Sequence, residues 1–462
     1  MYNINSREEK RNFYRLVVSL VLPMALQNLI NVGVTSADVI MLGKVGETAL
    51  ASSSLAGQVQ FIMTLIFFGL TSGAAVLTAQ YWGKKDTRSI EKILGISMRI
   101  ALAVAALFTV VVLLFPEQIM HIFSSERPVI EGGASYLRIV AISYIFTAVT
   151  MVYLNICRSV ERVVVATVVY LISLVINVIL NAVFIFGLLG MPAMGVRGAA
   201  LATMIARICE FILVMLYSKF VNKTIRFRFK DLFVSDKLLM KDFFIYAIPV
   251  MINELLWGSG VSVINAVIGH LGSPVVAANS VAQVVKQLAM VVTMGLANAT
   301  AIMIGKVIGE GKEALARAYG RRFVRLSLVL GVLGAGVILL VSPVVKANLT
   351  VSEESLQYLT MMLFVMAYFV IAQAYNTTMV VGVFRAGGDT KFGLVIDATT
   401  LWCGAIAFGA VAAFVWKLPV TVVYMILMSD EILKLPLCFF RYRSYKWVKN
   451  VTRDNPAESA VS

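Results

Sequence analysis

Long apolar segments, separated by short polar and basic ones, follow one another along almost the whole chain. Each is long enough to cross a bilayer as a helix, which takes about 20 predominantly apolar residues. Twelve such segments lie near 14–42, 48–82, 90–115, 132–156, 160–187, 195–218, 242–270, 275–308, 320–345, 357–385, 390–415 and 419–440. The pattern therefore predicts an all-α integral membrane protein with twelve transmembrane helices.

The two halves of the chain repeat one design. When the chain is shifted by 226 residues, the stretch that starts at Pro23 aligns with the stretch that starts at Pro249. Four glycine pairs coincide at this offset: Gly43 with Gly269, Gly46 with Gly272, Gly69 with Gly295 and Gly83 with Gly309. Because six helices per repeat is an even number, both repeats have the same orientation in the membrane.

The repeat predicts two parallel-related six-helix bundles around a central cavity, as in transporters whose halves rock about a site near the membrane midplane. We place the N-terminal lobe at 1–218, a cytoplasmic linker at 219–241, the C-terminal lobe at 242–440 and a cytoplasmic tail at 441–462. The polar residues after Lys449 are expected to be disordered.

Composition and charge agree with this architecture. The chain is 60% hydrophobic and 14% charged, with a mean hydropathy of +0.87, which a soluble domain cannot bury. The net charge is +15, but the predicted inner loops and termini hold 31 of the 40 Lys and Arg, and the outer loops hold 5. This asymmetry predicts a multi-pass protein of the bacterial inner membrane with both termini in the cytoplasm. It also argues against nucleic acid as a partner.

No motif of an enzyme is found in the sequence. The chain has no phosphate-binding glycine loop, no nucleophile elbow and no pair of catalytic carboxylates. Four cysteines and two histidines show no spacing typical of a metal site. We therefore expect no catalytic activity, no resident metal and no cofactor.

Charged residues inside the predicted spans need a reason, because each costs about 2.5–3.5 kcal/mol at the bilayer centre. Asp38 lies in the outer half of the first span, fifteen residues after Pro23, where a helix can bend. A carboxylate beside a bendable helix fits a proton or Na⁺ switch, although a carboxylate that caps the loop before Gly43 is the alternative.

Other intramembrane charges allow two interpretations. Glu254 and Lys286 lie in the middle of the seventh and eighth spans, so they either form a structural ion pair or line the cavity and bind substrate or ion. Snorkelling toward the cytoplasm and local pairing explain two further groups, Arg207 with Glu210, and Asp430 and Glu431 with Lys434. Asp397 has no evident partner in the sequence.

Several motifs resemble the multidrug and toxic compound extrusion (MATE) family. They are Pro23, Asp38 and Gly43-x-x-Gly46, the stretch Gly187 to Thr203 with Gly198-Ala-Ala-Leu-Ala-Thr203, and Arg385-Ala-Gly-Gly-Asp389-Thr390. The resemblance extends from about residue 12 to 445. It implies a secondary antiporter that exports small amphipathic, often cationic compounds in exchange for H⁺ or Na⁺ by rocking of its lobes.

The resemblance also implies roles for single residues. Asp38, Asn177, Asn181 and Thr203 would form an ion-coupling cluster, with Pro23 at a helix kink and Glu254 as a further acidic residue. Asn181 stands where many members have Asp, and no acid occurs near 374–376, so the coupling ion stays open. We expect a monomer. A lipid-linked oligosaccharide flippase of related fold remains the alternative function.

Overall fold

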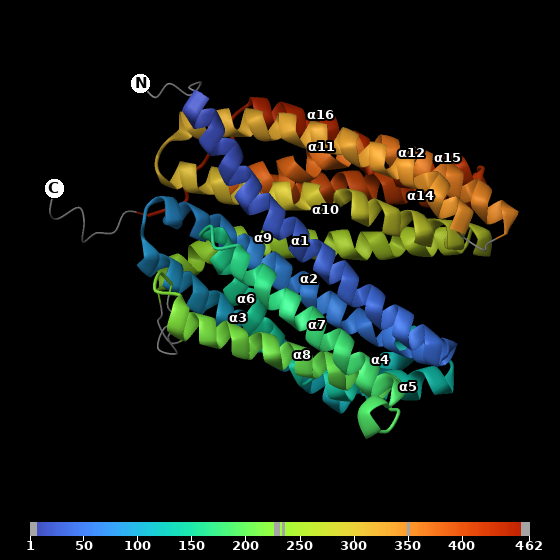
Figure 1. Cartoon of the computed structure of the whole chain (residues 1–462). Helices are drawn as coiled ribbons and strands as arrows, with labels where there is room; N and C mark the ends of the chain where they lie inside the picture. The colour runs from blue at the N-terminus through green and yellow to red at the C-terminus, as the bar shows by residue number, and fades with distance from the viewer. Residues whose placement is uncertain (1–6, 226–231, 233–235, 349–351, 454–462) are drawn as a thin grey trace. The chain divides into compact units, whose positions relative to one another are not determined.

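The computed structural model describes residues 7–225, 232, 236–348 and 352–453, and within these ranges the regular structure is entirely helical. Figure 1 shows the helices in chain order. They are α1 (Arg7–Val45), α2 (Glu47–Gly83), α3 (Thr87–Leu114), α4 (Pro116–Phe123), α5 (Arg127–Val140), α6 (Ser143–Ser159), α7 (Val164–Phe186), η1 (Leu188–Gly190), α8 (Val196–Leu216), η2 (Tyr217–Val221), α9 (Lys237–Gly269), α10 (Ser273–Gly309), α11 (Glu313–Asn348), α12 (Glu353–Thr377), η4 (Thr378–Phe384), α13 (Thr390–Asp397), η5 (Ala398–Ile406), α14 (Ala407–Phe414), α15 (Val420–Leu427) and α16 (Asp430–Arg443).

The helices match the predicted spans closely. In the described part of the chain, ten helical segments are long and apolar enough to cross a membrane, and the pair α5 and α6, bent by 56°, makes an eleventh. The twelfth predicted span is occupied by α15 and α16, which two residues separate. Large side chains such as Leu340 (77% exposed) and Leu22 (67% exposed) cover the outer faces, as contact with lipid requires. The predicted all-α, twelve-span membrane fold is confirmed.

The chain forms two compact units that exchange segments. Unit 1 contains residues 1–25, 75–85 and 246–462, and unit 2 contains residues 26–74 and 86–245. Three long helices, α1, α2 and α9, are therefore each divided between the two units. The N-terminal part of α1 and the C-terminal end of α2 pack with the second half of the sequence.

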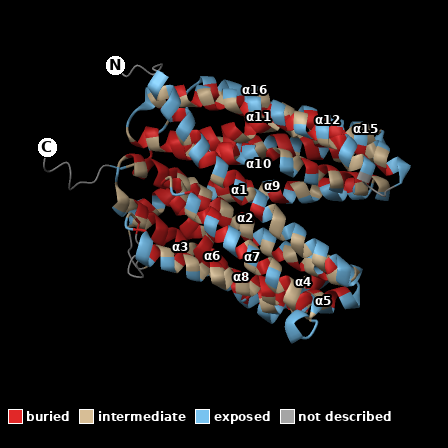
Figure 2. Cartoon of the chain, viewed as in Figure 1, coloured by how far each residue is buried: buried red, intermediate tan, exposed pale blue. Residues whose placement is uncertain are grey.

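Within each unit, neighbouring helices bury small and aliphatic side chains. In unit 2, α7 packs along α8, and α3 packs along α6. In unit 1, α10 packs against both α11 and α12. Figure 2 shows buried residues on the helix faces that look into a unit and exposed residues on the faces that look out. This is the burial pattern of helices with one lipid-facing side.

Two repeat-related glycines make the tightest helix contact of unit 1. A Cβ on Gly83 would lie 1.9 Å from the carbonyl oxygen of Lys306, and a Cβ on Gly309 would lie 1.9 Å from that of Gln80. Gln80 and Lys306 are themselves separated by the repeat offset. The ends of α2 and α10 thus cross with two-fold pseudosymmetry, and the backbones approach as closely as small residues allow in membrane helix pairs.

The segment after α16 is ordered up to Arg453, so the expectation of disorder after Lys449 is wrong for residues 450–453. Gln80 Nε2 donates to the carbonyl oxygen of Lys449 (3.0 Å), and Gln80 Oε1 accepts from the N–H of Val451 (2.8 Å). The Arg453 N–H donates to the Tyr81 hydroxyl. Paired backbone groups fix this polar segment against α2. The rest of the expected disordered tail, 454–462, lies outside the described residues.

Candidate functional site

Unit 2 contains a cavity of about 470 Å³ whose wall is formed by α1, α2, α5, α7 and α8. Its lining combines apolar and polar side chains. It includes hydroxyl and amide side chains such as Asn31, Thr35, Ser53, Ser54, Gln58 and Gln60, and the charged residues Asp38, Arg207 and Glu210. The volume lies within the range of small-molecule sites, about 300–1,000 Å³.

The approach of α7 and α8 brings the predicted ion-coupling residues together. Gly198, near the start of α8, lies so close to the end of α7 that a Cβ there would be 2.5 Å from the carbonyl oxygen of Phe184. Asn177 and Asn181 are four residues apart on α7 and therefore share a face. Thr203, on α8, lines the same cavity as Asn177.

Asp38 joins this group from α1. Asn181 Nδ2 donates a hydrogen bond to Asp38 Oδ1, and it also donates to Asn177 Oδ1 (3.1 Å). Asn181 Oδ1 and Thr203 Oγ1 are buried and make no well-formed hydrogen bond within the described residues. Orphaned buried polar atoms are rare and mark places where a ligand, ion or proton can bind. The structure thus brings all four predicted residues together, while their role in ion coupling stays a prediction.

Pro23 lies in the interior of α1, which continues through it from Arg7 to Val45. Proline has no N–H to complete the helical ladder, so this helix is weakened there. The division of α1 between the two units falls between Ala25 and Leu26, two residues further on. The predicted kink residue therefore lies next to a unit boundary.

The Arg207–Glu210 pair belongs to the cavity, which the sequence interpretation missed. Arg207 Nη1 donates to both Glu210 carboxylate oxygens (2.8 and 3.0 Å). The local pairing expected from the sequence is therefore confirmed, and the Glu210 carboxylate, at 2% exposed, is buried rather than extended to solvent. Spacing of three residues shows that the two can pair, but it does not show which side of α8 faces the cavity.

Glu254 has a different partner from the one considered in the sequence. Its Oε1 accepts a hydrogen bond from Arg385 Nη2 (2.7 Å), and the side chains are 12% and 5% exposed. Lys286, on α10, is not a partner of Glu254. A Glu254–Lys286 ion pair is therefore not present. Arg385 directly follows η4 and lies 131 residues from Glu254 in the sequence, beyond any spacing argument.

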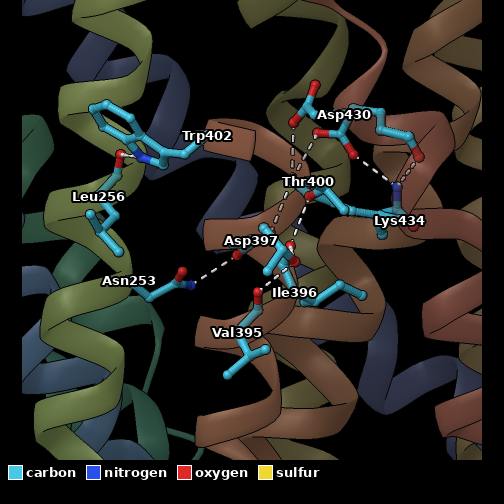
Figure 3. Close-up of polar contacts among 12 residues, drawn as sticks. Asn253, Leu256, Val395, Ile396, Asp397, Thr400, Trp402, Asp430 and Lys434 are labelled. Atoms are coloured by element: carbon cyan, nitrogen blue, oxygen red, sulfur yellow. Dashed lines mark hydrogen bonds and ion pairs between the residues drawn. The ribbon is translucent and has the colours of Figure 1, made fainter. Parts of the chain in front are cut away.

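Unit 1 holds a buried ionic cluster around Lys434, which gives Asp397 its partner (Figure 3). Lys434 Nζ lies 3.0 Å from Asp397 Oδ1, 3.1 Å from Asp430 Oδ2 and 3.9 Å from Glu431 Oε1. Asn253, on α9, donates to the other Asp397 oxygen (2.9 Å). The local pairing of Lys434 with Asp430 and Glu431 is thus confirmed, but the Lys434 side chain is 6% exposed, so this group is buried rather than snorkelling.

A second asparagine completes the cluster. Asn376 Nδ2, on α12, donates to the side chain of Glu431 (2.9 Å) and to its carbonyl oxygen (2.6 Å). The π-helical segment η4 begins two residues after Asn376, and η5 begins directly after Asp397. Turns of this kind inside helices occur frequently at functional sites. Two helices, α13 and α16, thus place three carboxylates around one lysine, and asparagines from α9 and α12 complete the group.

Comparison with known proteins agrees with this architecture. A family model described as MatE matches residues 23–183 and 249–411, and the two matches begin 226 residues apart, which is the repeat offset. The probable multidrug resistance protein YoeA of Bacillus subtilis (strain 168) is 22% identical over 97% of this chain and 98% of its own length. The probable multidrug resistance protein NorM of Bradyrhizobium diazoefficiens is 26% identical over 86% of this chain and 85% of its own.

Solved structures share the fold. A multidrug resistance MATE family transporter of the MOP superfamily, in an outward-facing conformation, superposes with a TM-score of 0.83 at 19% identity, over 93% of this chain and 94% of that one. A MOP superfamily transporter from Pyrococcus furiosus, described as having a binding pocket of reverse polarity, gives 0.84 at 19% identity, over 93% and 96%. Because the family model covers more than half of the sequence, and does so in both halves, the chain belongs to the MatE family of multidrug efflux transporters.

Proposed function

We propose that the chain is a secondary antiporter of the bacterial inner membrane. It exports small amphipathic, often cationic compounds in exchange for H⁺ or Na⁺, as a monomer with both termini in the cytoplasm. The supporting observation is the placement of Asp38 in the wall of a 470 Å³ cavity, hydrogen-bonded to Asn181. A carboxylate within a membrane span is functional by default, because its burial is costly.

The cavity charges suit exchange of cations. Asp38 and Glu210 carry two negative charges against the single positive charge of Arg207 when all are ionised. A coupling cation and a cationic cargo group would then compete for the same carboxylate, and each would favour the state that binds it better. Two lobes that open alternately to either side convert this competition into antiport. A net negative, drug-sized cavity fits this cargo better than a large anionic lipid-linked sugar.

Ion-driven transport by the whole protein tests the proposal. Purified protein is reconstituted into proteoliposomes, and efflux of a panel of cationic dyes is measured under a pH gradient alone and under a Na⁺ gradient alone. We expect at least one gradient to accelerate efflux of some dyes, and the effective gradient identifies the ion. Efflux that responds to neither gradient would contradict the proposal.

Asp38→Asn provides the variant for this assay. We expect gradient-driven efflux to fall at least about tenfold, because the amide binds neither a proton nor Na⁺ with comparable strength. Glu47→Gln is the matched control, since Glu47 is an exposed carboxylate at the start of α2. Wild-type efflux by Asp38→Asn at normal protein level would exclude Asp38 as the coupling residue.

A further inference from the structure

The wall of the unit 2 cavity includes a positively charged side chain, Arg207, which the proposed ion exchange does not require. Arg207 is one quarter exposed, whereas its partner Glu210 is 2% exposed. Both residues line the cavity, and Arg207 is the more exposed member of the pair.

The contact with Glu210 occupies only part of the guanidinium. One nitrogen, Nη1, serves both Glu210 oxygens, and Nε and Nη2 make no hydrogen bond to any described residue. A guanidinium presents five N–H donors in a planar fork, whose free edge matches a carboxylate with two parallel bonds. Arg207 thus retains donors for a second anion on the cavity side.

The same cavity also contains a negatively charged hydrogen-bond acceptor, the carboxylate of Asp38. Asp38, on α1, accepts from Asn181 through Oδ1, while no hydrogen bond to a described residue involves Oδ2. Tyr136, Tyr170 and Ser173 add hydroxyl groups to the wall between α5 and α7. A ligand that satisfied both charged groups would carry a cation at one end and an anion at the other.

We propose that Arg207 is an anion-binding subsite of this cavity and that the cargo is amphoteric, with a cationic group toward Asp38 and a carboxylate on Arg207. The inference rests on the proposed export function and makes its substrate class narrower. Charge-assisted, bidentate Arg–carboxylate bonds are strong enough to give at least about tenfold preference for the acid over its neutral ester.

Binding of a matched pair of probes tests this subsite. The probes are a zwitterionic rhodamine with a free carboxylate and the methyl ester of the same dye, which keeps the cation and loses the anion. Their affinities for the purified full-length protein are measured by fluorescence anisotropy, without any ion gradient. We expect the wild type to bind the free acid at least about tenfold more tightly than the ester.

The variants separate the subsite from a structural effect. Arg207→Gln alone would leave Glu210 buried and unpaired, so the double variant Arg207→Gln with Glu210→Gln removes both charges together. It should lose the preference for the acid and keep its affinity for the ester. Glu210→Gln alone, which keeps the guanidinium, should retain the preference. Arg127→Gln, which removes an arginine that is 90% exposed, is the control and should behave as wild type.

Three results would overturn the subsite: equal affinity of the wild type for both dyes, no binding of the acid, or an unchanged preference in the double variant. None of these depends on ion coupling, which the proteoliposome assay decides separately. A protein that prefers the acid but ignores both gradients would therefore keep the Arg207 subsite and lose the antiport mechanism.

Discussion

Each buried charge described above is compensated by particular neighbours rather than left to solvent. Asp38 has an amide donor, Glu254 has Arg385, and Lys434 has three carboxylates within 3.9 Å. In a low-dielectric interior such partners are needed, because an uncompensated buried charge costs several kcal/mol. The arrangement explains why so many ionisable residues are tolerated within the spans.

The Lys434 cluster gives a prediction at this scale. Lys434→Met should lower the free energy of unfolding by about 3–5 kcal/mol, because Asp397, Asp430 and Glu431 would lose their central cation. Adding Asp397→Asn should restore part of this loss by removing one of the excess negative charges. The measurement is denaturant unfolding of the detergent-solubilised protein.

Lys44→Met serves as the control for this series, since Lys44 is an exposed lysine in the last turn of α1. It should change the unfolding free energy little. If Lys434→Met proves as stable as the wild type, the cluster does not depend on its lysine.

At the scale of helices, small residues determine where elements touch. Gly198 brings α8 against the end of α7, and Gly83 and Gly309 bring α2 against α10. Association of helices in lipid depends on close packing rather than on the hydrophobic effect, so such contacts decide which helices pair. The repeated glycine pair found in the sequence thus has a structural reason.

Gly309→Ala should destabilise the crossing of α2 and α10. The new Cβ would lie 1.9 Å from the Gln80 carbonyl oxygen and 2.6 Å from its carbon, so backbone must move. We expect a loss of about 1–3 kcal/mol, the usual cost of overpacking, in the same unfolding assay.

Gly336→Ala is the matched control, because a Cβ there meets no atom within 4 Å and the change favours the helix by up to about 1 kcal/mol. Equal stability of the two alanine variants would mean that the crossing can relax without cost.

At the scale of the whole molecule, the chain passes between its compact units next to two repeat-related prolines. Two of the four boundaries fall after Ala25 and after Ile245, within four residues of Pro23 and Pro249. Both prolines lie inside continuous helices, α1 and α9. A helix interior that lacks a hydrogen bond is where a bend forms most easily.

Pro23→Ala and Pro249→Ala should therefore slow the conformational cycle of the proposed antiporter. We expect dye efflux at saturating dye to fall about tenfold in the double variant while dye affinity stays unchanged, because hinge residues act on the rate of interconversion. Stability should be equal or higher, since proline costs about 3 kcal/mol in a helix interior.

Pro419→Ala is the control for this pair, because Pro419 lies just before the first residue of α15 and not in a helix interior. Wild-type efflux by the double proline variant would exclude both positions as hinges.

The sequence alone determined the membrane class, the helix positions, the repeat and the group around Asp38. Hydropathy and spacing are properties of a single segment, and the 226-residue offset is visible without coordinates. Asn177 and Asn181 share a face by helical periodicity alone, and the family resemblance linked them to Asp38 and Thr203. The family match later supported the membership that these motifs indicated.

Only the tertiary structure decided which charges meet. Glu254 pairs with Arg385 rather than Lys286, Asp397 pairs with Lys434, and Arg207 lines the cavity of unit 2. The contact of Gln80 with Lys449 and Val451 could likewise not be predicted from the polar sequence of the C-terminal segment. The physical reason is common to all of them. Hydropathy fixes the depth of a residue in the membrane, but the rotation of each helix and the choice of its neighbours depend on packing between segments far apart in the chain.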